Sequence, residues 1–399
     1  MTSRGRLALG LGLVAYVVAW ATGSNALYPV AVGLVVVAVL TWTWVRLARR
    51  PVRVTRHSSR SDHYEGDDVA VGVDVELASG LVPPGAVVLR ERLSKLGDRE
   101  TALRGRGSVV SAGYVLDRLP RGRYVVEEAF AVLEDPFGLN RIETSLPAAS
   151  TLLVYPRLVA LESLFSDVGA TLPEGRRMLL RRPSGFDLHS VRDHQQGESL
   201  RRVHWRSTAK RGRLMVKELE DAPRDEVAIL LDAQAGGATG ASFDVLVRVA
   251  GSVLLAHANR NRRAVLLVNG ATQEISRASG EDDWRRALEV LAAAEPDGHR
   301  PVELLLADEA NLVARALELA VVTSTVGAKL VERLIQRSLA RRHVSLVYVD
   351  AVSFNGGGRA RETGLLRLQA AGIPVAVVRQ GDDLASALSR RTSTEAAYG

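Results

Sequence analysis

The pattern of hydrophobic and polar positions changes three times along the chain. The first region is an apolar run from Leu7 to Val45, 39 residues without a formal charge. A helix needs roughly 20 apolar residues to cross a bilayer, and the turn-prone stretch TGSNALYP at 22–29 lies in the middle of the run. The pattern therefore predicts a hairpin of two transmembrane helices within residues 1–50.

The charges beside this run predict its orientation. Arg4 and Arg6 precede it, Arg46 follows it, and the connecting loop is uncharged. Because basic residues stay on the cytoplasmic side of a membrane, we expect a multi-pass protein of the cell membrane with both termini and most of the chain in the cytoplasm. The alternative is a signal peptide cleaved after Ala19–Ala21, in which case Leu27–Val45 would still anchor the chain.

The second region, residues 51–156, alternates apolar and polar positions in short runs separated by Gly, Pro and Asp. The clearest runs are 68–79, 86–93, 108–119, 123–134 and 151–158. A period of two indicates antiparallel strands with one buried face. We expect a β-sandwich domain here.

Residues 157–225 show no such period, and from 171 to 217 they contain twelve Lys and Arg against four Asp and Glu. This pattern predicts an irregular basic loop or linker.

From residue 226 continuous apolar runs alternate with amphipathic helical patterns, as in EVAILLDA followed by the helical stretch at 243–260. That alternation is typical of a doubly wound α/β domain, predicted at 226–390 and followed by a disordered tail at 391–399. The whole chain is then an α+β multidomain protein.

Composition limits the possible functions. The formal net charge is +7, which favours anionic partners such as nucleic acid or an anionic lipid surface. The chain contains no cysteine, which excludes thiol nucleophiles and thiolate-bound zinc. The sequence also lacks a Gly-x-Ser-x-Gly elbow and a Gly-x-x-x-x-Gly-Lys-Ser/Thr loop. We therefore expect a protein without enzymatic activity and without a cofactor.

One basic segment carries a recognisable motif, DLHSVRDHQQGESLRRVHWRSTAKRGRLMVKELE at 187–220. It resembles the signature of the family called domain of unknown function 58. The matching positions are Gly197, Arg201, Trp205, Ser207, Ala209, Gly212, Leu214, Val216, Lys217 and Glu218. The upstream stretches LPRGRYVV, EDPFGL and LLVYPRL are also similar to features of this family.

This resemblance implies a von Willebrand factor A-like fold for the α/β domain and a MoxR-type AAA+ ATPase as partner. Such domains hold a divalent metal with Asp-x-Ser-x-Ser after the first strand, but this chain has Asp232 followed by Ala-Gln-Ala-Gly. A later strand ends in Thr323–Thr325 without a carboxylate. Since Mg²⁺ requires near-ideal oxygen geometry, we expect no metal here. We expect a binding crevice at the carboxyl ends of the strands, formed by Asp232, Gln234, Thr323, Ser324 and Thr325.

Together these features predict a membrane-tethered cytoplasmic scaffold or adaptor that binds protein partners in assembly or cell-envelope processes. The residues expected to contact the partner are Gly197, Arg201, Trp205, Arg206, Ser207, Lys210, Gly212, Lys217 and Glu218. A structural alternative is that the segment joins two domains, with Trp205 packed against the α/β domain. Two functional alternatives are a divalent-metal-dependent binding protein acting through Asp232 and an electrostatic nucleic-acid binder, although a single tryptophan is a poor stacking platform.

Overall fold

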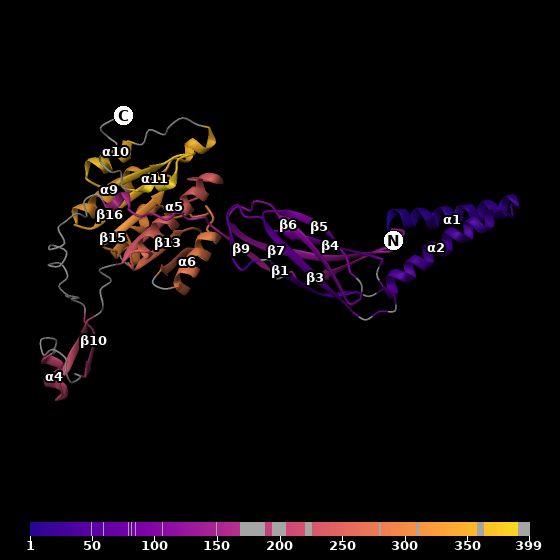
Figure 1. Ribbon diagram of the computed structural model, residues 1–399, viewed down its shortest axis with the longest axis horizontal. Helices are drawn as coiled ribbons and strands as arrows, with labels where there is room; N and C mark the ends of the chain where they lie inside the picture. The colour runs from indigo at the N-terminus through magenta and orange to yellow at the C-terminus, as the bar shows by residue number, and fades with distance from the viewer. Residues whose placement is uncertain are drawn as a thin grey trace. The chain divides into compact units, whose positions relative to one another are not determined.

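The structure is a computed structural model (Figure 1). It describes residues 1–48, 50–58, 60–78, 80, 82–83, 85–105, 107–148, 150–167, 188–193, 205–219, 226–278, 281–308, 311–356 and 363–389. The chain divides into two compact units, 1–155 and 156–399. Each unit is described by itself.

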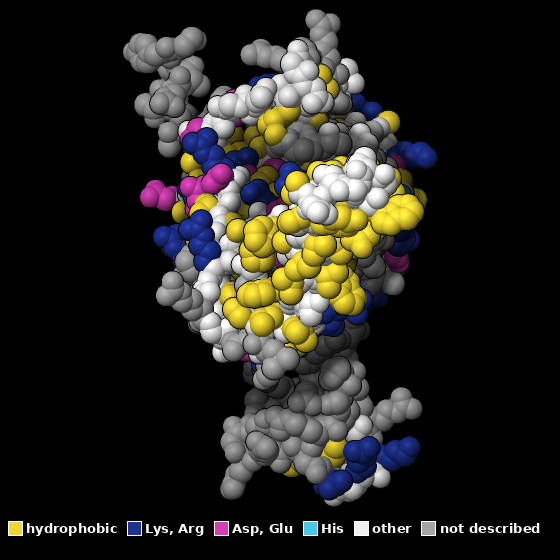
Figure 2. Space-filling view, turned by 90° about the vertical axis from the view of Figure 1, so that its right-hand side faces the viewer, with side chains coloured by type: hydrophobic (Ala, Val, Ile, Leu, Met, Phe, Trp, Pro, Cys, Tyr) yellow, Lys and Arg dark blue, Asp and Glu magenta, His cyan; other side chains and the backbone are white. Residues whose placement is uncertain are grey.

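Two apolar helices open the first unit, α1 (Ser3–Thr22) and α2 (Leu27–Leu47). The hydroxyl groups of Thr41 and Thr43 donate to carbonyls four residues earlier, at 2.9 and 2.8 Å, so these polar groups are satisfied within the helix. Apolar side chains cover the surface of this end of the unit (Figure 2). Both helices are long and apolar enough to cross a membrane, which confirms the two predicted apolar helices.

The rest of the first unit consists of two sheets. Their strands are β1 (Pro51–Ser58), β2 (His63–Tyr64), β3 (Val69–Leu77), β4 (Ala86–Leu93), β5 (Gly97–Leu103), β6 (Val109–Leu116), β7 (Gly122–Glu134), β8 (Arg141–Leu146) and β9 (Thr151–Tyr155). One sheet has the order β1-β3-β6, and the other has the order β2-β9-β7-β4-β5 with β8 also paired to β7. Alternate residues of both sheets, such as Val73 of β3 and Leu89 of β4, share one core. This is the two-layer arrangement that the alternating pattern predicts.

The second unit is built on one six-stranded sheet. Its strands are β12 (Val227–Asp232), β13 (Ala264–Asn269), β14 (Gln273–Ala278), β15 (Glu318–Thr323), β16 (His343–Val349) and β17 (Val375–Val378). The spatial order is β14-β13-β12-β15-β16-β17, with β14 antiparallel and the other neighbours parallel. Counted along the chain from β12 this is 3-2-1-4-5-6, the order of a doubly wound sheet.

Helices cover both faces of this sheet. They are α5 (Ala241–Ala258), α6 (Glu281–Ala293), α7 (Val302–Leu305), α8 (Leu312–Arg315), α9 (Ala328–Leu339), α10 (Thr363–Ala370) and α11 (Leu384–Leu388), with a short 3₁₀ turn at Ala351–Asn355. Alternate residues of β12 feed two separate cores, Ile229 and Leu231 on one face and Ala228 and Leu230 on the other. Helix α5 is also long and apolar enough to cross a membrane, but most of its side chains are buried in the first of these cores.

Within the described parts of 157–225, the structure shows regular elements where the sequence predicts an irregular loop. Leu161, Leu164 and the 3₁₀ turn Phe165–Asp167 pack into the α/β core. Farther on, β10 (Leu188–Asp193) pairs antiparallel with β11 (Met215–Leu219), and α4 (Trp205–Arg211) lies between them in sequence. These elements are only three to seven residues long, which is too short for a clear period to appear in the sequence.

Arg337 provides a test of this packing. Its guanidinium is buried and donates to the carbonyl oxygens of Ala314 at 2.6 Å and Ala316 at 2.8 Å; burial lowers its pKa to about 10. Because hydrogen bonds to charged groups contribute about 1.5–3 kcal/mol, Arg337→Ala should lower the free energy of unfolding by about 2 kcal/mol. Denaturant titration of the full chain in detergent measures this change.

The matched control is Arg333→Ala, which removes an exposed arginine from the same helix. We expect it to change the unfolding free energy by less than about 0.5 kcal/mol. Equal effects of the two substitutions would contradict the assigned role of Arg337.

Candidate functional site

The predicted crevice residues come together at the carboxyl ends of β12 and β15. Asp232 is only 5% exposed. One of its carboxylate oxygens accepts a hydrogen bond from the Thr323 hydroxyl at 2.6 Å, and the other accepts one from the Gln234 backbone N–H at 3.1 Å. Both oxygens of this carboxylate are therefore engaged within the protein.

The loop after β15 is tightly folded against the loop after β12. The Thr325 backbone N–H donates to the Thr323 hydroxyl oxygen at 3.0 Å. A Cβ atom added to Gly237 would lie 2.9 Å from the Ser324 hydroxyl oxygen. The two loops therefore approach closely at Gly237, and a side chain there would require the Ser324 hydroxyl to shift.

A segment that sequence reasoning missed covers the ends of β12 and β13. The Gly298 N–H donates to the Ala233 carbonyl, and the Ala235 N–H donates to the Gly298 carbonyl, both at 2.8 Å. The side-chain amide of Asn269 donates to the Arg300 carbonyl at 2.7 Å. A Cβ atom on Gly298 would lie 2.2 Å from the Asn269 carbonyl oxygen. The turn-like sequence PDGHR at 296–300 indicates a loop, but nothing in it indicates where that loop packs.

These contacts decide what the crevice can hold. Burial raises the pKa of Asp232, against the opposing effect of hydrogen bonds from Thr323, Gln234 and Asn269. Mg²⁺ would require several oxygen ligands in octahedral geometry, and this site offers one carboxylate that already accepts two hydrogen bonds. Within the described residues, no group of three or more His, Cys, Asp or Glu side chains is arranged to hold a metal. The absence of a divalent metal here stays a prediction, which the engaged carboxylate oxygens of Asp232 support.

The signature segment is described in part. Gly197 and Arg201 lie outside the described residues, as do the side chains of Arg206, Lys217 and Glu218. Trp205 begins α4 and is 66% exposed. This exposure disfavours the structural alternative, in which Trp205 packs against the α/β domain, since a packed indole would be buried.

The C-terminal half of helix α4 is hydrogen-bonded to the chain that leads into β11. The Gly212 N–H donates to the Thr208 carbonyl at 2.9 Å, and Gly212 has a φ of 66°, which allows the chain to leave the helix in the left-handed region. The Met215 N–H then donates to the Thr208 hydroxyl at 3.0 Å, and the Met215 side chain is buried. Gly212 thus has a structural role, whereas Lys210 lies on the exposed part of α4 and Ser207 is half-buried.

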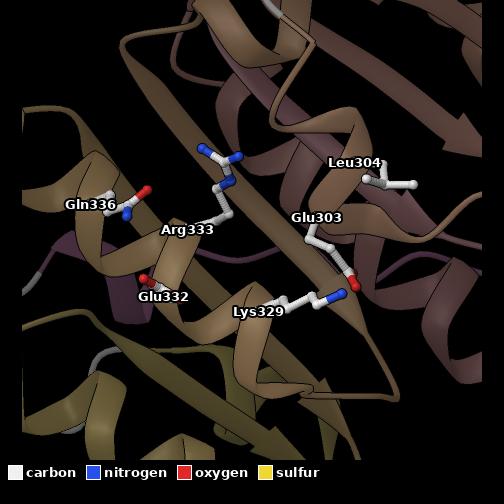
Figure 3. A pocket seen from close by; sticks show the side chains of 6 residues that line it. All are labelled: Glu303, Leu304, Lys329, Glu332, Arg333 and Gln336. Atoms are coloured by element: carbon white, nitrogen blue, oxygen red, sulfur yellow. The ribbon is translucent and has the colours of Figure 1, made fainter.

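A recess of about 260 Å³ lies between α7 and α9 (Figure 3). Its lining residues are Glu303, Leu304, Lys329, Glu332, Arg333 and Gln336. In Figure 3 the amino group of Lys329 points toward Glu303. Helix α7 starts directly after the Gly298 segment, and α9 starts shortly after Thr323–Thr325. The N-terminal ends of both helices are therefore close in sequence to the crevice. Sequence reasoning missed it because the outer faces of α7 and α9 resemble ordinary solvated surfaces.

Comparison with known proteins confirms the family resemblance. Residues 190–351 match the family described as Protein of unknown function DUF58, and this segment belongs to that family. The uncharacterized protein YeaD of Bacillus subtilis (strain 168) is 23% identical over 201 residues, which cover 50% of this chain and 50% of YeaD. The chain therefore spans about half the length of this curated relative.

Solved structures resemble the chain only remotely. The Pseudomonas fluorescens alkylpurine DNA glycosylase AlkC, bound to DNA containing an abasic site analog, matches with 12% identity and a TM-score of 0.15, over 31% of this chain and 39% of AlkC. A glycosyl hydrolase family 2 member from Bacteroides cellulosilyticus matches with 12% identity and a TM-score of 0.17, over 82% of this chain and 37% of that chain. Similarity at this level carries no argument about fold or activity.

The raised pKa of Asp232 predicts a pH dependence. Between the usual aspartate value of 3.8 and the raised value, the folded state keeps a proton that the unfolded state has lost. Stability therefore falls as pH rises through this window, and Asp232→Asn removes that loss. We expect the unfolding free energy of the variant, relative to wild type, to increase from about pH 4 upward, as measured by denaturant titration at several pH values.

Asp98→Asn is a control of opposite sign. Asp98 is exposed, and its hydrogen bond from Arg92 lowers its pKa, so any stabilisation by Asp98 is present above its unfolded pKa and lost as pH falls. A relative stability of Asp232→Asn that stays constant or decreases with pH would contradict the burial of this carboxyl group.

Proposed function

We propose that the protein is a membrane-tethered cytoplasmic scaffold without enzymatic activity, which binds a protein partner through α4. The observation that carries this proposal is the exposure of Trp205, 66% accessible on a helix whose last turn contains Lys210 and Arg211. Trp and Arg are enriched among the residues that dominate protein interfaces. An exposed indole beside two cations is therefore suited to an acidic protein surface with an apolar pocket.

The tether is supported by α1 and α2, whose apolar side chains are largely exposed in Figure 2. Exposed apolar surface of this extent is stable in lipid and unfavourable in water. The arginines at the base of the hairpin favour an orientation with both ends and the two compact units in the cytoplasm.

The α/β unit is proposed to be von Willebrand factor A-like. This proposal is supported by its 3-2-1-4-5-6 strand order with an antiparallel edge strand, and by the position of Asp232 at the end of the first strand. By family resemblance the proposed partner is a MoxR-type AAA+ ATPase, acting with this protein in assembly or cell-envelope processes. Fold resemblance alone does not define function, so the partner requires a direct test.

Affinity purification from crosslinked native membranes is that test. We expect the AAA+ ATPase to co-purify with wild type and to be lost with Lys210→Glu combined with Arg211→Glu, because reversed charge repels an acidic surface. The matched control combines Lys329→Glu with Arg333→Glu on α9, which makes the same charge change at the recess. Retention of the partner by the α4 variant and its loss from the α9 variant would move the interface to the recess.

The two functional alternatives have separate tests. A thermal titration with Mg²⁺ or Mn²⁺ should leave the melting temperature unchanged; a stabilisation that disappears in Asp232→Asn would favour metal-dependent binding instead. For nucleic acid, we expect a mobility-shift assay at low salt to show no complex. A complex that weakens steeply as salt increases would favour the electrostatic nucleic-acid binder.

A further inference from the structure

The turn between β7 and β8 lies against the base of the helical hairpin. The Thr2 backbone N–H donates to the Leu139 carbonyl at 2.9 Å, and the Thr2 hydroxyl donates to the Gly138 carbonyl at the same distance. From the other helix, the Thr41 hydroxyl oxygen accepts a hydrogen bond from the Asn140 side-chain amide at 2.8 Å. The turn is therefore bonded to both helices at once.

This contact is close and buried. A Cβ atom on Gly5 would lie 2.1 Å from the Leu139 carbonyl oxygen, so α1 can approach the turn only because residue 5 is glycine. Thr41 and Asn140 are 5% and 2% exposed. A buried hydrogen bond between two polar side chains fixes their relative position, because breaking it would leave both groups unsatisfied.

The turn is closed by hydrogen bonds of its own. Asp135 is buried, and its carboxylate accepts hydrogen bonds from the backbone N–H groups of Phe137, at 2.8 Å, and Asn140. The Gly138 N–H donates to the Asp135 carbonyl at 3.0 Å, and Gly138 has a φ of 66°. The sequence DPFGLN at 135–140 thus forms a compact loop, and the Phe137 side chain lies exposed on it.

The bonds to the hairpin set the depth of this turn relative to a bilayer. Thr41 lies six residues before the end of α2 at Leu47, about 9 Å along the helix axis at 1.5 Å per residue. The apolar parts of the helices end at Arg6 and Arg46, and Arg46 stacks over the Trp42 ring at 4.9 Å. Arginine and tryptophan side chains mark the boundary between headgroups and hydrocarbon. In a membrane-spanning hairpin the turn would therefore lie at that boundary.

Phe137 is 68% exposed within this turn. An exposed phenylalanine ring is unfavourable in water, and insertion into a lipid interface would remove its apolar surface from water. We propose that the Asp135–Asn140 turn is a membrane-contact site, with the Phe137 ring inserted at the boundary between lipid headgroups and acyl chains. This inference rests on the proposed membrane tether and adds a third contact to the two helices. It orients the sandwich on the bilayer.

The absence of cysteine from the natural sequence makes a direct test possible, since one introduced cysteine is the only labelling site. The full chain carrying Phe137→Cys is labelled with an environment-sensitive fluorophore and reconstituted into phosphatidylcholine–phosphatidylglycerol vesicles. Lipids with a nitroxide near the headgroup then quench any label at the interface. We expect strong quenching and a blue-shifted emission at position 137.

Two further single-cysteine variants serve as controls with the same label. Tyr64→Cys replaces a partly exposed aromatic residue on β2, which through β9 adjoins the end of β7 opposite the turn. It should show neither quenching nor a blue shift. Val36→Cys, in the middle of α2, should be quenched by nitroxides placed deep in the acyl chains.

The three positions separate the possible failures. If position 36 is quenched but position 137 behaves like position 64, the membrane contact of the turn is overturned and the tether stands. If position 36 is not quenched, the tether fails and the contact proposed for Phe137 fails with it. Quenching at 64 as strong as at 137 would attribute the signal to the label and overturn the inference.

Discussion

Burial of β12 on both faces is the constraint on which the α/β unit depends. All six of its residues are buried, and successive side chains enter opposite cores. Each fully buried Leu or Ile contributes about 1.5–3 kcal/mol, so this strand must remain central and must be covered by helices on both faces. The chain direction then brings Asp232 to the carboxyl edge, where polar side chains are needed to satisfy backbone groups.

Protein groups occupy the carboxyl edge of the sheet around Asp232. Thr323 and Gln234 hydrogen-bond to the Asp232 carboxylate, and Gly298 bonds to the backbone on either side of Gln234. The polar groups that would bind a ligand in an open crevice are thus used to close it. Two other surface features of the described α/β unit are open to solvent, namely α4 with its exposed Trp205 and the recess between α7 and α9.

Sequence patterns predicted the parts of the fold that have long, uniform periods. The hairpin follows from its two long apolar runs, and alternating strands such as β7 follow from burial of one face. The continuous apolar strand β12 follows from burial of both faces. The grouping of Asp232 with Thr323–Thr325 followed from strand ends meeting at one edge. Short elements with charged surfaces were missed: α4 has seven residues and three cationic side chains, and β14 reads QEISRA, with a single large apolar residue.

Other features depend on contacts distant in sequence, which no local pattern reveals. The Gly298 segment reaches the crevice from beyond α6, and the Asp135–Asn140 turn meets Thr2 and Thr41 across more than ninety residues. Sequence alone left two readings of Trp205 open, contact with a partner or packing against the α/β domain, because tryptophan is common both at interfaces and in cores. Its exposed position on the short helix α4 is the observation that supports the first reading.

Site-specific photocrosslinking tests most directly whether α4 contacts a protein partner at the membrane, as proposed. A photoreactive phenylalanine analogue would replace Trp205 in the full chain, and a second variant would carry it at Leu366, an exposed residue of α10. Irradiation of native membranes should yield one discrete adduct from position 205, containing an AAA+ ATPase, and none from position 366. The same adducts from both positions, or none from position 205 with the chain present in the membrane, would contradict the account.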